Sequence, residues 1–268
     1  MTRLLYIGGY GHSGSTLLEC LIASSPAVLA CGEVASCVRE RDSKQKRCTC
    51  GHKAGHCPVW SFFYSETSRT VSGDHIALLL ALMQRVDGRY AALIDSSKTA
   101  WGSITAPFRL KRKFGRDFIL LHLTREPAAV CWSVLKQKNR RAYRGELTHY
   151  TLRCSWIVLG WSIANFSCDL FGMLYPQQYV RLRYEDLARS PTEILGKLFA
   201  RLMPDVQWDS EEVAGDNRHQ LYGNKVRHRA IGIEDVKEDI KWKAEMPPEY
   251  SRIVQPLSYL LRLRYGYS

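Results

Sequence analysis

The sequence lacks the features of a secreted, membrane-spanning or repetitive protein. Met1-Thr2-Arg3 leads directly into a short apolar run with no cleavable leader, so we expect no secretory signal. The longest apolar segment, 155–175, is interrupted by serine, asparagine and aspartate, which favours a buried helix over a transmembrane segment. The chain has no internal repeat and no low-complexity tract. We therefore expect a cytoplasmic protein.

The chain has fewer acidic than basic side chains, 26 against 38. It also has nine cysteines, an odd number. Several cysteines lie within apolar segments, so the sequence predicts no secreted disulfide framework and mostly reduced thiols. The net charge is +12, and residues 101–200 hold 16 basic against seven acidic side chains. The basic clusters at 109–116 and 136–144 suit binding of an anionic partner, or equally a solvated helix face. No nucleic-acid partner is expected, and the oligomeric state stays open.

Short apolar runs alternate with helical patterns along the 268 residues. The pattern predicts one domain, 1–268, with a loop-rich insertion at about 34–70. Its fold class is α/β, with a P-loop-like parallel sheet flanked by helices on both faces. Ligands then bind at the carboxyl ends of the strands. The expected strands are 4–7, 28–30, 90–94, 118–123 and 180–183.

A glycine loop joins the first expected strand to the first helix. Gly8, Gly9, Gly11 and Gly14 follow the apolar run, and Ser15-Thr16 opens a helical segment. Glycines allow backbone amides to turn toward a ligand, and a helix N-terminus adds its unpaired N–H groups. This order of strand, loop and helix predicts a phosphate or sulfate site.

Two common uses of such a loop fit incompletely. Gly9-x-Gly11-x-x-Gly14, with Glu33 further on, matches a dinucleotide fingerprint, but that fingerprint does not call for a Ser-Thr pair. The Gly9 to Gly14 spacing also matches the phosphate loop of nucleoside-triphosphate enzymes. Those enzymes place a lysine after the second glycine, where this chain has Ser15. The mismatch weakens a kinase-like interpretation.

Four segments together resemble sulfotransferases that use 3′-phosphoadenosine-5′-phosphosulfate (PAPS). The loop Gly11-His12-Ser13-Gly14-Ser15-Thr16 resembles their 5′-phosphosulfate loop, and 123–133 resembles their 3′-phosphate segment. Asp95-Ser96-Ser97-Lys98 resembles a strand end of the bacterial and carbohydrate-type branch, and 223–227 its C-terminal phosphate-binding loop. One residue departs from the family pattern, because His12 stands where Lys or Arg is usual.

The resemblance implies a reaction and a set of site residues. A sulfuryl group would pass from PAPS to a hydroxyl of a glycan, small molecule or peptide, leaving adenosine 3′,5′-bisphosphate (PAP). No metal is needed for that transfer. The alternatives are a kinase-like enzyme and a regulatory protein that binds a nucleotide without catalysis. The implied cofactor-binding residues are Gly11, His12, Ser13, Gly14, Ser15, Thr16, Arg125, Ser133 and Arg227, and the implied catalytic residues are His12, Glu33 and Lys98.

Each catalytic candidate also has a purely structural interpretation. His12 is alternatively an ordinary loop histidine, Glu33 a carboxylate at a helix N-terminus, and Lys98 a solvent-exposed side chain. His122, inside an apolar strand, is interpreted as a core histidine.

The insertion also carries cysteines that suit a zinc site. Cys48-x-Cys50 with Cys57, and with Cys37 upstream, gives a candidate set that His52 or His56 would complete. This spacing is not that of a standard zinc finger, and a labile disulfide or plain reduced thiols are the alternatives.

Overall fold

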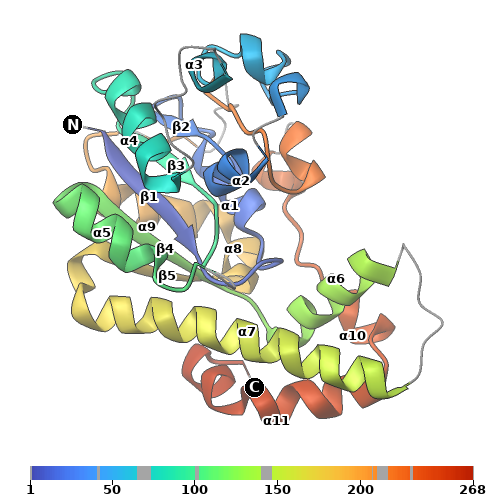
Figure 1. Ribbon diagram of the computed structural model, residues 1–268. Helices are drawn as coiled ribbons and strands as arrows, with labels where there is room; N and C mark the ends of the chain where they lie inside the picture. The colour runs from blue at the N-terminus through green and yellow to red at the C-terminus, as the bar shows by residue number, and fades with distance from the viewer. Residues whose placement is uncertain are drawn as a thin grey trace.

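The computed structural model describes residues 2–40, 43–64, 74–99, 103–139, 147–206, 208–209, 217–229 and 232–267. Within them, a five-stranded parallel sheet has the order β2-β3-β1-β4-β5 (Figure 1). The strands are β1 (Arg3–Gly8), β2 (Val28–Ala30), β3 (Ala92–Asp95), β4 (Phe118–Thr124) and β5 (Tyr179–Arg183). Each lies within two residues of a predicted apolar run.

Helices alternate with these strands, as the sequence pattern predicts. Asp74 caps the helix that begins at His75, because its carboxylate accepts a hydrogen bond from Ile76 N at 3.3 Å. The helix before β4 begins at Ala106, with Pro107 in its first turn. The helices are α1 (Ser15–Ile22), α2 (Val34–Arg39), α3 (Ser61–Tyr64), α4 (His75–Val86), α5 (Ala106–Phe114), α6 (Pro127–Asn139), α7 (Leu147–Leu174), α8 (Tyr184–Arg189), α9 (Pro191–Leu202), α10 (Trp242–Glu245) and α11 (Pro248–Tyr265).

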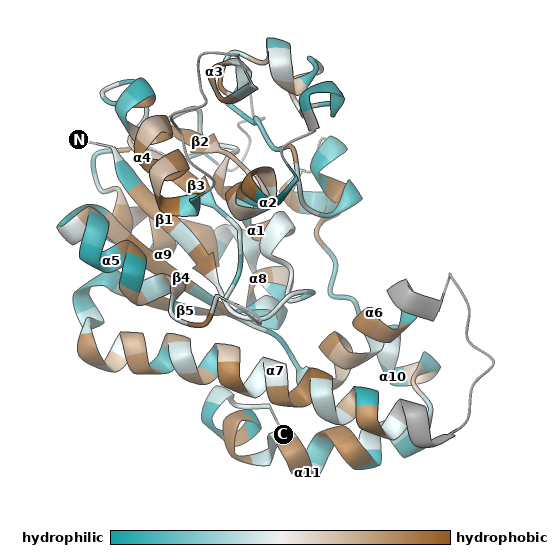
Figure 2. Cartoon of the chain, in the orientation of Figure 1, coloured by the Kyte–Doolittle hydropathy of each residue, from teal (hydrophilic) through white to brown (hydrophobic). Residues whose placement is uncertain are grey.

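Both faces of the sheet are buried, because side chains of each strand alternate between two apolar clusters. On β1, Leu4 and Tyr6 pack with α4, α5 and α7, whereas Leu5 and Ile7 pack with α1, α8 and α9. Figure 2 shows the central strands as hydrophobic and α5, which carries the first basic cluster, as largely hydrophilic. The predicted parallel sheet with helices on both faces is confirmed.

A third apolar cluster joins α6, α7 and α11 beside the sheet (Figure 1). Among the described helices, one segment, Thr151–Leu174 of α7, is long and apolar enough to cross a membrane, and 56% of its most apolar stretch is buried. It packs on β4, α6 and α11. One face of the helix is therefore buried, whereas Trp156, Phe166 and Met173 on it are exposed, so the expectation of a buried helix holds for part of its surface.

The predicted insertion consists of short elements joined by turns. It contains α2, the 3-10 turns Ser43–Gln45 and Ala54–His56, and α3. Residues 41–42 and 65–73 lie outside the described part of the chain. The insertion follows β2, so it lies at the end of the sheet where β2 is the edge strand.

The parallel strands direct four loops to one edge of the sheet. β1 leads into the glycine loop, β2 into Glu33, β3 into Lys98 and β4 into Arg125. Because all these strands run in the same direction, their carboxyl ends lie together. Residues from four distant parts of the sequence can therefore form one site.

Candidate active site

The glycine loop turns through three residues with left-handed backbone angles. The φ values are 112° at Gly9, 67° at His12 and 93° at Gly14. A Cβ at Gly9 would lie 2.5 Å from the carbonyl oxygen of Leu123, and one at Gly14 would lie 2.6 Å from the ring of Tyr184. Only glycine fits these two close approaches. His12 is held in a conformation that few non-glycine residues adopt, which is common at functional sites.

The loop and the start of α1 form a polar cradle. Gly14 is the N-cap of α1, so the first amides of the helix lack helical partners. Ser13 and Ser15 are buried, and Ser13 Oγ has no hydrogen-bond partner among the described residues. Thr16 Oγ1 accepts a hydrogen bond from Asn224 N at 3.2 Å, which attaches the C-terminal loop to the cradle. Amides at the positive end of a helix, beside an unsatisfied hydroxyl, fit an anion.

Arg125 forms a second cationic position at the end of β4. Its side chain is 7% exposed; Nη1 donates to the carbonyl oxygen of His12 at 3.0 Å, and Nη2 to Asp239 Oδ2 at 3.0 Å. The guanidinium lies over the ring of Tyr184, 4.4 Å from its centroid, and its Nε has no hydrogen-bond partner among the described residues. The guanidinium is therefore fixed in place by two of its five N–H groups, which leaves others, Nε–H among them, to bind an anion.

Ser133 connects this second position to the glycine loop. It lies about two turns into α6, the helix that follows β4. Its Oγ is 2.9 Å from Nδ1 of His12. The same histidine therefore contacts Arg125 through its carbonyl oxygen and Ser133 through its ring. The two predicted phosphate sites are adjacent and share His12.

Glu33 and Lys98 meet across the ends of β2 and β3. The ammonium of Lys98 contacts Glu33 Oε1, while Glu33 Oε2 accepts a hydrogen bond from Ser36 Oγ at 3.2 Å. Their side chains are 19% and 20% exposed, so both reach solvent. Glu33 is the N-cap of α2, but its side chain makes no capping hydrogen bond. Its carboxylate is therefore directed to Lys98 instead of to the helix amides.

The backbone at Lys98 is fixed by its neighbours. Its φ is 67°, and its carbonyl oxygen accepts hydrogen bonds from Tyr6 at 2.6 Å and Ser103 at 3.1 Å. A Cβ on Gly11 would lie 3.9 Å from Lys98 Cδ, so the lysine side chain passes beside the glycine loop. With its side chain 20% exposed and in contact with Glu33, Lys98 is not the freely solvated lysine of the structural interpretation.

Glu19 lies beneath these strand ends and was not anticipated from the sequence. It is fully buried on α1, where its carboxylate accepts hydrogen bonds from Gly32 N at 2.6 Å and Ser96 Oγ at 2.8 Å. Burial raises its pKa from 4.5 to about 7. Glu19 connects the segment before Glu33 to the segment before Lys98 and so positions both.

Asp95, the last residue of β3 and the neighbour of Ser96, also holds the two strand ends in place. Its Oδ1 accepts hydrogen bonds from Val34 N at 3.2 Å and Ser97 N at 3.0 Å, and its Oδ2 lies 2.6 Å from His75 Nε2. The Asp-Ser-Ser-Lys segment is therefore held by its own aspartate, which also fixes the start of α2.

A cavity of about 890 Å³ opens at this edge of the sheet. Among the predicted residues, seven line it alongside Lys98: His12, Gly14, Ser15, Thr16, Glu33, Arg125 and Ser133. Sequence reasoning missed Tyr184, Lys237 and Asp239, which also line it. A cavity of this size suits a nucleotide-sized ligand.

The C-terminal phosphate-loop prediction falls on a 3-10 turn, Lys225–His228, beside the cradle. Arg227 Nη1 donates to Gly223 O at 2.6 Å and to Asn224 O at 3.2 Å, and its Nε has no hydrogen-bond partner among the described residues. Arg229 lines the cavity, whereas Arg227 does not. The predicted role of Arg227 at the 3′-phosphate remains a prediction.

His122 has a structural role on β4. Nδ1 lies 2.8 Å from the Tyr179 hydroxyl, Nε2 lies 2.8 Å from Asn165 Oδ1, and the side chain is fully buried. Burial lowers its pKa to about 4. The interpretation of His122 as a core histidine is confirmed.

Comparison with known proteins identifies the family. A sulfotransferase family model matches residues 5–210, so the chain belongs to the sulfotransferase family. No curated protein sequence matches the chain.

Solved structures share the fold at low sequence identity. The sulfotransferase domain of the curacin biosynthetic pathway is 19% identical, with a TM-score of 0.57 over 96% of this chain and 97% of that one. The sulfotransferase domain of the Synechococcus PCC 7002 olefin synthase is 17% identical, with a TM-score of 0.60 over 97% and 95%. A mouse sulfotransferase complexed with PAP is 12% identical, with a TM-score of 0.53 over 96% and 81%. The family and fold predicted from the motifs are confirmed.

Proposed function

We propose that the protein transfers a sulfuryl group from PAPS to an acceptor hydroxyl and releases PAP. The observation that supports this most strongly is the pair of anion-binding positions at one cavity, the cradle before α1 and the Arg125 guanidinium, joined through His12. PAPS carries one anionic group at the 5′ position of its ribose and another at the 3′ position. The cradle and the Arg125 guanidinium would each bind one of these groups. A mononucleotide with phosphates on one side only would use half of the site.

The donor would be held mainly by charge-assisted hydrogen bonds. Gly11, Ser13, Gly14, Ser15 and Thr16 would bind the 5′-phosphosulfate through amides and hydroxyls, with the unpartnered Ser13 Oγ as one donor. Arg125 and Ser133 would bind the 3′-phosphate, assisted by Arg227. Such fixed donors need little rearrangement during the reaction, which is the main source of electrostatic catalysis.

The transfer itself would use Lys98, His12 and Glu33. The S–O bond to the phosphate breaks, a new S–O bond forms to the acceptor oxygen, and the hydroxyl proton passes to the Glu33 carboxylate. Lys98 and His12 would stabilise charge on the sulfonyl and bridging oxygens. In the structure, Lys98 contacts Glu33. An anionic donor would compete for that ammonium and leave the carboxylate able to accept the proton.

The acceptor is proposed only as a hydroxyl compound, on a glycan, small molecule or peptide. The test is incubation of the purified protein with PAPS and a panel of such acceptors, with PAP release and sulfated product followed by mass spectrometry. We expect PAP release that depends on one acceptor class. PAP binding without any transfer would instead indicate a regulatory nucleotide-binding protein.

A further inference from the structure

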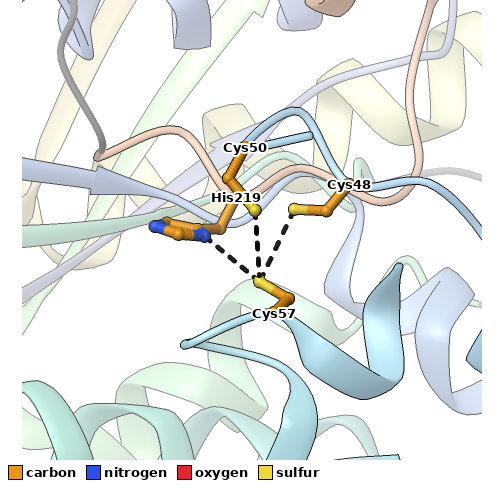
Figure 3. A group of neighbouring side chains, drawn as sticks. All are labelled: Cys48, Cys50, Cys57 and His219. Atoms are coloured by element: carbon orange, nitrogen blue, oxygen red, sulfur yellow. Dashed lines mark hydrogen bonds between the residues drawn. The ribbon is translucent and has the colours of Figure 1, made fainter. Parts of the chain in front are cut away.

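Four metal-ligand side chains converge outside the active-site cavity (Figure 3). They are Cys48, Cys50 and Cys57 of the insertion, together with His219 from a segment 162 residues further along the chain than Cys57. Their ligand atoms all lie within 4.8 Å of one another. Sequence reasoning identified the three cysteines but not the histidine.

The three sulfurs and the imidazole nitrogen lie close enough together to share one metal ion. Cys57 Sγ lies 3.7 Å from both Cys48 Sγ and Cys50 Sγ, and 3.2 Å from His219 Nδ1. Tetrahedral zinc with Zn–S bonds of about 2.3 Å separates its sulfurs by about 3.8 Å. A disulfide instead brings two sulfurs to about 2.05 Å. We propose that Cys48, Cys50, Cys57 and His219 bind one structural Zn²⁺ ion.

The backbone of the insertion presents two of the thiols from a tight turn. Cys48 N donates to His52 O at 2.8 Å, Gly51 N donates to Cys48 O at 3.0 Å, and Gly51 has a φ of 88°. The turn places Cys48 and Cys50 on the same side. The next 3-10 turn, Ala54–His56, delivers Cys57 to face them. The geometry is thus created by main-chain hydrogen bonds that do not require a metal.

The backbone of His219 is fixed on two sides. Its N–H donates to Ala30 O at the end of β2 at 2.8 Å, and its carbonyl oxygen accepts a hydrogen bond from the buried indole of Trp60. Next to it, Thr49 Oγ1 donates to Arg218 O at 2.7 Å. The histidine is therefore attached to both the sheet and the insertion, as expected for a preorganised ligand.

Burial and donor type favour a closed structural site. Cys48, Cys57 and His219 are 1%, 0% and 4% exposed, and Cys50 is partly buried. Three sulfurs and one imidazole are a structural zinc donor set, and four protein ligands leave no open coordination position. Binding requires thiolates, so zinc would displace the thiol protons. Of the histidines expected from the sequence, His56 is exposed, and His52 is exposed with its Nδ1 3.7 Å from Cys50 Sγ alone, whereas the buried His219 completes the cluster.

Cys37, the fourth cysteine considered from the sequence, lies elsewhere. Its buried Sγ is 3.9 Å from the carbonyl oxygen of Glu33, in the apolar cluster that contains Leu4 and Tyr6 of β1. All nine cysteines are unpaired by disulfides. The disulfide alternative for the insertion is therefore not formed in the structure.

The proposed zinc would join the insertion to the C-terminal loop. His219 precedes Gly223 and Asn224 by a few residues, and Asn224 N donates to Thr16 Oγ1 in the cradle at 3.2 Å. The zinc would reinforce the hydrogen bonds that already join these two segments, among them those of Thr49 with Arg218 O and Gln220 N. This role is structural and does not depend on the proposed sulfuryl transfer.

The first experiment measures metal in the full-length protein purified without a metal-affinity column. We expect about one zinc per chain by plasma mass spectrometry, as for a four-ligand site. Cobalt exchanged for the zinc should give the visible absorption of a tetrahedral thiolate site. Zinc well below half an equivalent after refolding with added Zn²⁺, a different resident metal, or a disulfide among the three cysteines by intact-mass analysis would overturn the proposal.

The second experiment assigns the ligands. Cys48→Ser and His219→Ala should lose most of the zinc, whereas His219→Cys should retain it by supplying a fourth sulfur. His56→Ala and Cys154→Ser are the matched controls, since they alter an exposed histidine of the insertion and a buried cysteine of the third apolar cluster, and His52→Ala tests the rival histidine beside Cys50. All three variants should keep zinc at the level of the unaltered protein. Loss of zinc in His52→Ala with retention in His219→Ala would contradict the assignment.

Discussion

His12 and Ser133 lie 121 residues apart in the chain, yet Nδ1 of the histidine is 2.9 Å from the serine hydroxyl. His12 belongs to the loop proposed to bind the 5′-phosphosulfate, and Ser133 to the helix proposed to bind the 3′-phosphate. The contact means that the two halves of the site are not independent. Loops of this type usually carry Lys or Arg at the position of His12. In this chain the imidazole ring of His12 makes the contact with Ser133.

The first prediction concerns this coupling. Ser133→Ala should weaken PAP binding by about 1 kcal/mol, the cost of one hydrogen bond. His12→Asn keeps a residue that tolerates the left-handed backbone at this position. In a double-mutant cycle measured by calorimetry, the two substitutions should show a coupling energy of about 0.5–3 kcal/mol, as contacting residues do. Strictly additive losses would mean that the contact does not matter for binding.

The second prediction concerns the 3′-phosphate. Arg125→Ala should weaken PAP by about 1.5–3 kcal/mol, the range for hydrogen bonds to charged groups, and weaken adenosine 5′-monophosphate much less. Arg116→Ala, which removes an exposed arginine before β4, is the matched control and should change neither affinity. The comparison of the two nucleotides removes effects of Arg125 on loop structure, since it also holds His12 O. Equal losses for both nucleotides would place Arg125 away from the 3′-phosphate.

The third prediction separates binding from catalysis. Glu33→Gln should lower kcat by about 100-fold or more, the usual contribution of a general base, while PAP affinity stays within a few fold. Glu40→Gln is the control, because Glu40 is 62% exposed and pairs only loosely with Lys46 at 3.9 Å. Steady-state kinetics with the acceptor identified from the panel provides the measurement. Unchanged kcat in Glu33→Gln would assign the base to another residue.

The fourth prediction follows from the buried carboxyl group of Glu19. The folded protein retains this proton up to a pKa of about 7, whereas the unfolded chain loses it near 4.5. The free energy of unfolding should therefore fall as the pH rises from 4.5 to 7, by up to about 3 kcal/mol, and stay level above that range. Below 4.5 the group is protonated in both states and contributes no pH dependence.

Glu19→Gln should remove this part of the pH dependence and keep an acceptor for Gly32 N. Urea unfolding from pH 4.5 to 8 measures it. Glu193→Gln is the control and should follow the unaltered protein over this pH range, because the hydrogen bond with Lys197 lowers the pKa of this exposed carboxylate from 4.5. Parallel curves for Glu19→Gln and the unaltered protein would show that Glu19 ionises normally.

Local chemistry explains which parts of the structure the sequence predicts. The strands and the glycine loop each depend on a few consecutive residues, so composition and spacing indicate them. Glu33, Lys98 and Arg125 each follow a predicted strand. Because the carboxyl ends of parallel strands lie at one edge of the sheet, their proximity can also be predicted from the sequence.

Long-range partners were the part that the sequence could not supply. Glu19 looks like one more residue of an apolar helix, and only the fold brings it to Gly32 and Ser96. His219 lies in a polar segment with no spacing that relates it to Cys57. The hydrogen bond from His219 N to Ala30 O, at the end of β2, brings His219 to the three cysteines. His52 and His56 are closer to these cysteines in the sequence, but both are exposed.

The most direct test of the account is a calorimetric titration of the unaltered protein with PAP, ATP and NAD. The two anion positions at one cavity predict that PAP binds most tightly, with one site per chain, and that NAD and ATP bind far more weakly. Tight binding of NAD or ATP with no measurable binding of PAP would contradict the proposed PAPS-dependent transfer.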